Sequence, residues 1–370
     1  MNKLKIALVK QEVYQDLYVC PVTEKDPGQI LFSSMGRVGP IALMSDLNAD
    51  FYIVKEESNK ETRIYQKVIP HIAPYLHLLK TETLDKIPGQ EFKSPGSPYP
   101  NGKYAVSCYT IDWGQYDIVI SIISLPTQLI LKYPQTLFAY MIGEANMATG
   151  KARFGYDATL NQMARGRISH KCGAIDFPYT FVAKDTLEKI MQQYLGRPSA
   201  RKGIFMEINS TTERPVTRIP DHFQPLADAG YEIILHQQKI ADNLKNIYDA
   251  KYFVKMGGRS IRGNSVAEAV SLGTLAIMNR DEVIHHELII DECNVKTMDE
   301  MISLINRLEN DPELYRTLQQ KQRQVLHTYF FDAPLQSLIN CLKEKRGLSK
   351  PRTYSRWNRL FDNLYFLKLR

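Results

Sequence analysis

The chain has 370 residues, of which 44% are hydrophobic. This length is greater than that of a domain with a single hydrophobic core, and it predicts two domains of ordinary size. Its five cysteines are widely spaced and include no Cys-x-x-Cys pair, so the pattern excludes a disulfide framework and a zinc site of that type. The net charge of the chain is +7, and the segment 343–370 accounts for all of it, because this segment contains nine Lys or Arg residues and two acidic residues. Residues 1–342 therefore have no net charge, which argues against an enzyme that acts on nucleic acids.

The first half of the chain alternates strand-like and helical stretches, a pattern typical of a mostly parallel sheet covered on both faces. Strands are expected at residues 5–10, 51–55, 117–123 and 136–142. Between the first two strands lie Gly36, Arg37 and Gly39, followed by a helical stretch. Glycines at a helix start favour a ligand-binding turn, and a plain tight turn is the alternative.

A second series of strands and helices follows residues 195–200, which have the composition of a linker. Strands are expected at residues 203–208, 231–236, 252–255 and 274–278, and helices at residues 223–229, 240–248, 298–308 and 312–327. Thr297 and Glu300 match a capping box, and Asp311 precedes a proline suited to the first helical position. We therefore expect two α/β domains with a cleft between them.

The most informative segment of the second half is residues 256–277, MGGRSIRGNSVAEAVSLGTLAI, which joins two expected strands. Its glycines let the backbone approach a ligand, its arginines supply positive charge, and the start of the next helix points free N–H groups at an anion. This pattern predicts a phosphate or diphosphate site. The residues assigned to it are Gly257, Gly258, Arg259, Ser260, Arg262, Gly263, Asn264 and Ser265.

Two further features of this segment concern its helix. Gly273 is expected to end the helix, and the next residues to form a buried strand. Ser265 and Glu268 also match a capping box, in which Glu268 would bond the Ser265 backbone and contact no ligand. Lys202, Arg214 and Arg218 lie near the first strand of the same domain and are weaker phosphate candidates, because a solvated basic loop explains them as well.

The second domain resembles the donor-binding domain of GT-B glycosyltransferases, above all their family 4 group. The family motif E-G-F-G-L-x-x-x-E-A-M-A-x-G-T-P-V-I is matched by Ser260-Ile-Arg-Gly263 and by Glu268-Ala-Val-Ser-Leu-Gly-Thr-Leu-Ala-Ile277. The resemblance implies a fold of two Rossmann-like α/β domains facing across a cleft. It also implies that Glu268 binds the nucleotide ribose, with two hydroxyl groups donating to its carboxylate.

The chain departs from this family motif at its first glutamate, whose place is taken by Ser260. Arg259 and Arg262 are likewise not the basic pair of the family, so their role at the diphosphate rests on local chemistry. The resemblance implies a glycosyltransferase of polysaccharide biosynthesis that moves a sugar from a nucleotide-sugar donor to a saccharide or lipid-linked acceptor. A GT-B-like nucleotide-sugar epimerase and a non-catalytic nucleotide or glycan-binding protein are the alternatives.

The expected chemistry requires charge stabilisation on the leaving diphosphate and, for inversion, a general base. Arg262 is the candidate for the first role and Glu144, at the end of an expected strand, for the second, with a solvated acid as the alternative for Glu144. The residues 36–39 would then lie on the acceptor side. The chain contains no Asp-x-Asp, so we expect transfer without a metal or another cofactor.

The expected domains are 1–195 for the acceptor, 196–345 for the donor, and a basic amphipathic helix at 346–370. The last helix carries apolar residues at helical spacing and is expected to pack back on the first domain, or on a membrane surface as the alternative. No apolar run reaches the length of a membrane span, and residues 1–9 are too short for a signal peptide. A cytoplasmic protein, at most peripheral to the inner face of a membrane, is expected.

Overall fold

The computed structural model describes twelve stretches of the chain that together hold two compact units. Unit 1 draws its described residues from Met1–Val22, Leu47–Pro178 and Ala333–Arg370, and unit 2 draws them from Tyr179–Asp332. The described stretches are 4–11, 47, 49–54, 105–106, 108–121, 125–142, 155–161, 174–177, 186–207, 217–236, 240–257 and 264–348.

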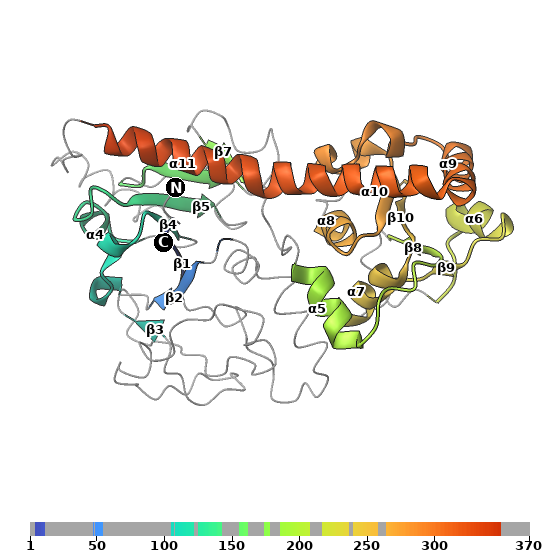
Figure 1. Ribbon diagram of the computed structural model, residues 1–370, viewed down its shortest axis with the longest axis horizontal. Helices are drawn as coiled ribbons and strands as arrows, with labels where there is room; N and C mark the ends of the chain where they lie inside the picture. The colour runs from blue at the N-terminus through green and yellow to red at the C-terminus, as the bar shows by residue number, and fades with distance from the viewer. Residues whose placement is uncertain are drawn as a thin grey trace. The chain divides into compact units, whose positions relative to one another are not determined.

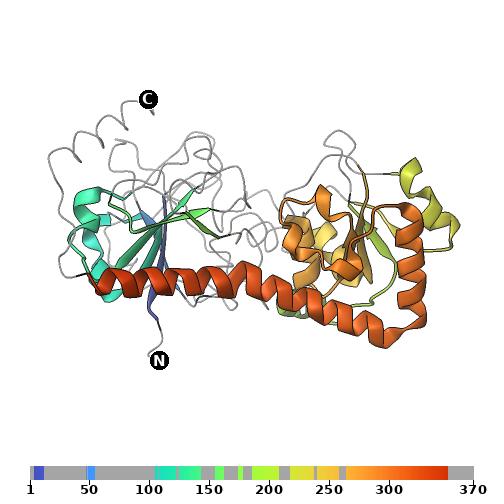
Figure 2. The same cartoon turned by 90° about the horizontal axis from the view of Figure 1, so that it is seen from above.

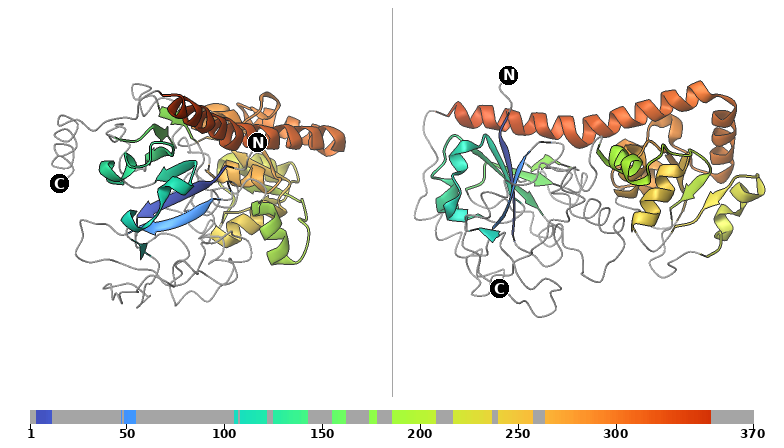
Figure 3. Two further views of the ribbon diagram at one scale, coloured as in Figure 1. Left: turned by 60° about the vertical axis from the view of Figure 1, so that its left-hand side comes forward. Right: turned by 60° about the horizontal axis from the view of Figure 1, so that its bottom comes forward.

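Unit 1 contains a parallel sheet with the strand order β3-β2-β1-β4-β5-β6-β7 (Figures 1 and 3). The bounds are β1 Ile6–Gln11, β2 Asp50–Val54, β3 Ala105–Val106, β4 Ile118–Ser121, β5 Leu137–Ile142, β6 Ala158–Asn161 and β7 Ala174–Asp176. The central strands are nearly continuous apolar runs, as expected when both faces of a parallel sheet are covered. Four of these strands, β1, β2, β4 and β5, confirm the sequence prediction, whereas β3, β6 and β7 were not predicted.

The order of the strands in unit 1 reverses beside β1. The chain runs from β1 outward to β2 and β3, and then returns to place β4 against the other side of β1. In open α/β sheets, ligands bind outside the carboxyl ends of the strands at such a reversal. In unit 1 this edge is formed by Gln11 at the end of β1 and Ser121 at the end of β4.

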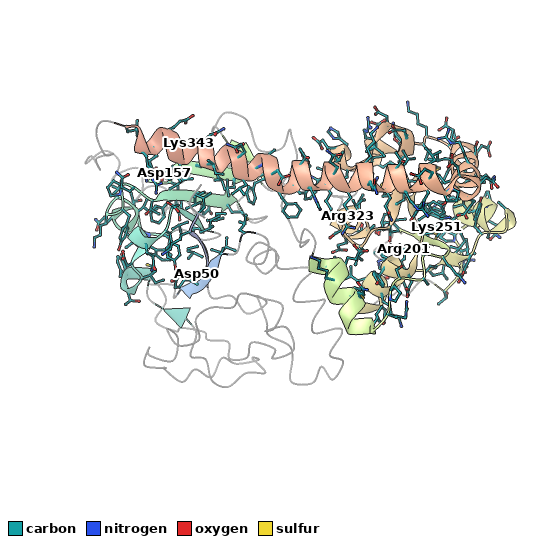
Figure 4. All side chains as sticks on the ribbon, in the orientation of Figure 1. Asp50, Asp157, Arg201, Lys251, Arg323 and Lys343 are labelled. Carbon is teal, nitrogen blue, oxygen red and sulfur yellow. The ribbon has the colours of Figure 1, made fainter. Side chains whose placement is uncertain are left out.

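Helix α11, Ala333–Arg346, packs on the sheet of unit 1, where it contacts β5 and β7 (Figure 2). Lys345 Nζ lies 2.8 Å from Asp157 Oδ2, an ion pair in which Asp157 is 4% and Lys345 13% exposed, and Figure 4 labels Asp157 beside this helix. Arg346 Nη2 lies 2.8 Å from Asp117 Oδ1. Burial works against the charged form of Asp117, but hydrogen bonds from the Lys5 backbone and from Arg346 hold its pKa below the ordinary value.

The contacts of two helices differ from the predicted domain boundaries. Helix α11 lies in the stretch expected in the second domain, yet it packs on unit 1, and helix α5, Thr186–Leu195, lies in the stretch expected in the first domain, yet it contacts α7 and α8 of unit 2. The periodicity of a helix shows which of its residues are buried and does not identify the partner. The expected helix at 346–370 lies, from residue 349 onward, outside the described residues.

Unit 2 contains a parallel sheet with the order β11-β10-β8-β9, covered by helices that pack on one another and on β11. The bounds are β8 Ile204–Met206, β9 Ile233–Ile234, β10 Tyr252–Lys255, β11 Leu275–Met278, α6 Gln224–Asp228, α7 Ile240–Asp249, α8 Asn264–Ser271, α9 Met298–Asn310 and α10 Pro312–His327. The capping box of Thr297 and Glu300 and the cap by Asp311 confirm the predicted starts of α9 and α10.

The described helices include none that is long and apolar enough to cross a membrane.

The carboxyl end of α8 is closed at the predicted residue, Gly273, which has a φ of +80°. Its N–H donates to the Val270 carbonyl and the N–H of Thr274 donates to that of Ala269, which together form a Schellman motif. Arg201 adds a cation at this end, with Nη2 donating to the Leu272 carbonyl at 2.6 Å. The helix therefore stops at a defined point before β11.

Gly273→Ala is expected to destabilise unit 2 more than Gly230→Ala does. Both glycines have positive φ, which costs another residue about 1–2 kcal/mol, and a Cβ at Gly230 would meet nothing within 4 Å. A Cβ at Gly273 would lie 2.5 Å from Arg201 Nη2, which is held by Leu272 and by Glu188. We expect a further loss of about 1–3 kcal/mol from this overpacking. Guanidinium unfolding measures both variants, and equal losses would contradict the role given to Arg201.

Candidate functional site

The candidate site lies at the carboxyl ends of the strands of unit 2, where the strand order reverses. The chain runs from β8 to β9 on one side and then places β10 on the other side of β8. The reversal therefore falls between β8 and β10, the position at which open α/β sheets bind ligands. The glycine and arginine segment identified from the sequence leaves the sheet at this position, because it follows β10.

Polar side chains gather at this edge on strands that are otherwise apolar. Glu207, 8% exposed, follows β8, and Lys255, fully buried, ends β10. Because Phe205 and Phe253 stack with ring centroids 5.6 Å apart and side chains alternate along a strand, Glu207 and Lys255 extend from the same face of the sheet. The hydrogen bond from Glu207 N to the Val254 carbonyl, 2.9 Å, continues the pairing of the two strands to this edge.

Lys255 and Glu282 hold the first glycine of the segment. The Lys255 ammonium forms an ion pair with Glu282 and donates to the Gly257 carbonyl at 3.0 Å. The Gly257 N–H donates to Glu282 Oε1 at 2.9 Å. Gly257 has a φ of +73°, and a Cβ there would meet nothing within 4 Å, so glycine is favoured here by its backbone conformation alone. These three residues are called the Gly257 clamp below.

Helix α8 begins at Asn264, immediately after the segment, as the sequence predicts. Its first-turn N–H groups have no partner within the helix and can serve an anion. Ser265 is the second residue of the helix, and the capping-box interpretation of Ser265 and Glu268 stays an alternative to a ligand-binding role for Glu268. Glu268 lies one turn into the helix and is half-buried between Ala267 and Ala269.

Several assigned residues lie outside the described part of the chain. On the donor side these are Gly258, Arg259, Ser260, Arg262 and Gly263, together with the side chain of Asn264. On the acceptor side they are Glu144, Gly36, Arg37 and Gly39. In the sequence, Glu144 comes two residues after the end of β5, and residues 36–39 lie between β1 and β2.

Three basic residues of unit 2 are engaged or placed away from this edge. Arg280 follows β11, but its guanidinium donates to the Ile289 carbonyl and to Asp291, at 2.6 Å each, and this bond lowers the pKa of the Asp291 carboxyl. Arg201 caps the end of α8. Lys202 precedes β8 and so lies at the amino ends of the strands, the opposite edge, which corrects its assignment as a phosphate candidate.

Sequence reasoning missed Glu207, Lys255 and Glu282. A signal existed for Lys255, because a lysine that ends the apolar strand Tyr252–Lys255 is unusual for a buried position. No comparable signal existed for Glu282, which is 27 residues away and reaches the clamp only through the fold. Within the described ranges, no group of three or more His, Cys, Asp or Glu residues is placed to hold a metal ion.

Comparison with known proteins shows only distant likeness. No family model and no curated protein sequence matches the chain. Among solved structures, T4 phage β-glucosyltransferase is 12% identical, with 93% of this chain and 100% of that chain covered and a TM-score of 0.40. Sucrose-phosphate synthase of Thermosynechococcus elongatus is 15% identical, with 92% of this chain and 99% of that chain covered and a TM-score of 0.40. Anabaena Alr3699/HepE in complex with UDP is 9% identical, with 92% of this chain and 100% of that chain covered and a TM-score of 0.36.

Proposed function

We propose that the chain is a glycosyltransferase that moves a sugar from a nucleotide-sugar donor to a saccharide or lipid-linked acceptor. One observation supports this best: the segment with three glycines and two arginines follows the carboxyl end of β10, beside the strand-order reversal, and precedes the start of α8. This position suits a diphosphate. The resemblance of Glu268–Ile277 to the family 4 motif supports the proposal that the diphosphate is part of a nucleotide sugar.

The proposed reaction breaks the bond between the anomeric carbon and the diphosphate and forms one to an acceptor oxygen. Arg259, Arg262 and the first N–H groups of α8 stabilise the charge that develops on the diphosphate. Glu268 accepts hydrogen bonds from the ribose hydroxyls. For an inverting reaction, Glu144 accepts the proton of the acceptor hydroxyl. We propose that these groups suffice without a metal ion.

A thermal-shift screen tests the donor site. The purified chain is heated with UDP, GDP, ADP, CDP or their sugar conjugates, each with and without EDTA. A compound that binds only the folded chain stabilises it by about 2.7 kcal/mol at 100 times its dissociation constant, which raises the Tm by several degrees. We expect one base to raise the Tm most and EDTA to leave that shift unchanged. If no compound shifts the Tm and none binds in calorimetry, the donor site is contradicted.

The presence of Ser260 in place of the first family glutamate supports a second candidate function, because a site that lacks this glutamate can bind a nucleotide sugar without transferring it. Incubation of the chain with the best donor alone, followed by product analysis, separates the functions. An isomerised sugar indicates an epimerase, and an unchanged donor that stays unchanged with every saccharide acceptor indicates a binding protein. A new glycoside formed only with an acceptor supports the transferase.

A further inference from the structure

The Gly257 clamp is an arrangement that the proposed transfer reaction does not itself require. Lys255 is the last residue of a strand whose other members, Tyr252, Phe253 and Val254, are apolar and buried. Replacing a buried ion pair by apolar residues of similar volume is often neutral or stabilising, so stability alone does not explain this lysine.

The hydrogen bonds of the clamp act on the backbone on both sides of the Gly257 Cα. Glu282 accepts from the Gly257 N–H, Lys255 donates to the Gly257 carbonyl, and the two side chains pair with each other. This closed set of contacts holds Gly257 at its positive φ. Gly257 is the residue from which the glycine and arginine segment 258–263 departs.

The other end of that segment is also held. Helix α8 begins at Asn264 and is fixed as a body by its packing against α7, α10 and β11. Six residues, 258–263, therefore span two supported points. A loop whose ends are held in the conformation that binds loses less freedom when a ligand arrives, and it binds more tightly for that reason.

We infer that Lys255 and Glu282 are positioning residues that set the glycine and arginine segment for diphosphate binding. The inference rests on the proposed function only in the nature of the ligand. The clamp contacts no ligand itself and acts through the Gly257 backbone. Its removal is therefore expected to weaken diphosphate binding while the fold remains.

The test uses the full chain with Lys255→Met and Glu282→Met combined, which removes both hydrogen bonds to Gly257 and leaves no unpaired charge. The matched control is Lys251→Met combined with Glu309→Met. These substitutions remove an ion pair in which Lys251 Nζ lies 2.9 Å from Glu309 Oε2, and Lys251 directly precedes the amino end of β10. Inorganic pyrophosphate, UDP, ADP and GDP are titrated by calorimetry. We expect roughly a 10-fold rise in the dissociation constant for the clamp variant and less than a 2-fold change for the control.

Limited digestion with trypsin supplies a readout that needs no ligand. Trypsin cleaves after Arg259 and Arg262, and we expect cleavage there to be roughly 10-fold faster in the clamp variant than in the parent or the control, because local opening is easier. Circular dichroism and the Tm verify that each variant is folded. If the clamp variant does not fold, Lys255→Gln with Glu282→Gln is used, since it leaves no unpaired buried charge and keeps an amide oxygen that can accept from Gly257, and a smaller change in the same direction is expected.

The outcomes separate the inference from the proposed function. If the parent chain binds none of the four compounds but the clamp variant is cleaved faster at Arg259 and Arg262, the donor site fails and the positioning role stands. If the parent chain binds and the clamp variant binds equally well, the positioning role is overturned. Equal effects in the clamp and control variants also overturn it, because they would report general loosening of β10.

Discussion

Arg262→Ala is expected to lower kcat/KM for sugar transfer roughly 10²-fold to 10³-fold, the loss typical when a donor to a developing negative charge is removed. The proposed role of Arg262 is to stabilise the leaving diphosphate, so the effect should fall mainly on kcat. The dissociation constant of the nucleoside diphosphate should rise as well, by roughly 10-fold to 100-fold, because a charge-assisted hydrogen bond contributes about 1.5–3 kcal/mol. Steady-state kinetics with the best donor and calorimetry with its diphosphate measure the two effects.

Two further variants show whether this loss is specific to Arg262. Arg262→Lys keeps the charge but not the planar fork of donors, and it should recover part of the activity. Arg316→Ala removes an arginine on α10 that forms an exposed pair with Glu313, and it should leave both measurements unchanged. Unaltered diphosphate binding in Arg262→Ala, or equal losses in Arg316→Ala, would remove Arg262 from the site.

Lys345→Met is expected to destabilise unit 1 by about 3–5 kcal/mol, the usual cost of removing one partner of a buried ion pair. Lys345 joins α11 to the sheet through Asp157 and through the Thr136 carbonyl, at 2.8 Å and 2.6 Å. The variant takes a cation away from a carboxyl group that is nearly fully buried. Guanidinium unfolding, followed by the fluorescence of buried Trp113, measures the loss.

Neighbouring variants make the Lys345 prediction specific. Arg346→Met breaks the more exposed pair with Asp117 and should cost at most about 1 kcal/mol. Adding Asp157→Asn to Lys345→Met removes the buried charge but keeps an acceptor for the Phe138 N–H, and it should restore more than half of the loss. A cost below about 1 kcal/mol for Lys345→Met alone would mean that α11 is held by apolar contacts and not by this pair.

Much of the fold follows from local patterns. Strands β1, β4, β5, β10 and β11 are apolar runs bounded by polar residues, and they lie where the sequence predicts them. The helix starts at Thr297 and Asp311 were predictable because a cap uses residues within one turn of each other. Strands such as β3, with two residues, escape prediction because so few positions cannot show a period.

One part of the candidate site could also be predicted from local sequence patterns, and the other part could not. Its glycines, its arginines and the helix start at Asn264 form one continuous stretch, so the sequence alone identifies them. The sequence did not reveal that this stretch begins beside a strand-order reversal, because strand order depends on pairing between residues far apart in the chain. The partner of Lys255 was hidden for the same reason.

The sequence by itself therefore determined the α/β class, most of the strands, both ends of α8, the starts of α9 and α10, and the segment proposed to bind a diphosphate. These features depend on neighbours within a few residues. The tertiary structure alone decided that α5 packs in unit 2 and α11 in unit 1, that Lys202 lies at the edge away from the site, and that Lys255 and Glu282 hold Gly257. Each of these depends on long-range packing, which composition and spacing along the chain do not encode.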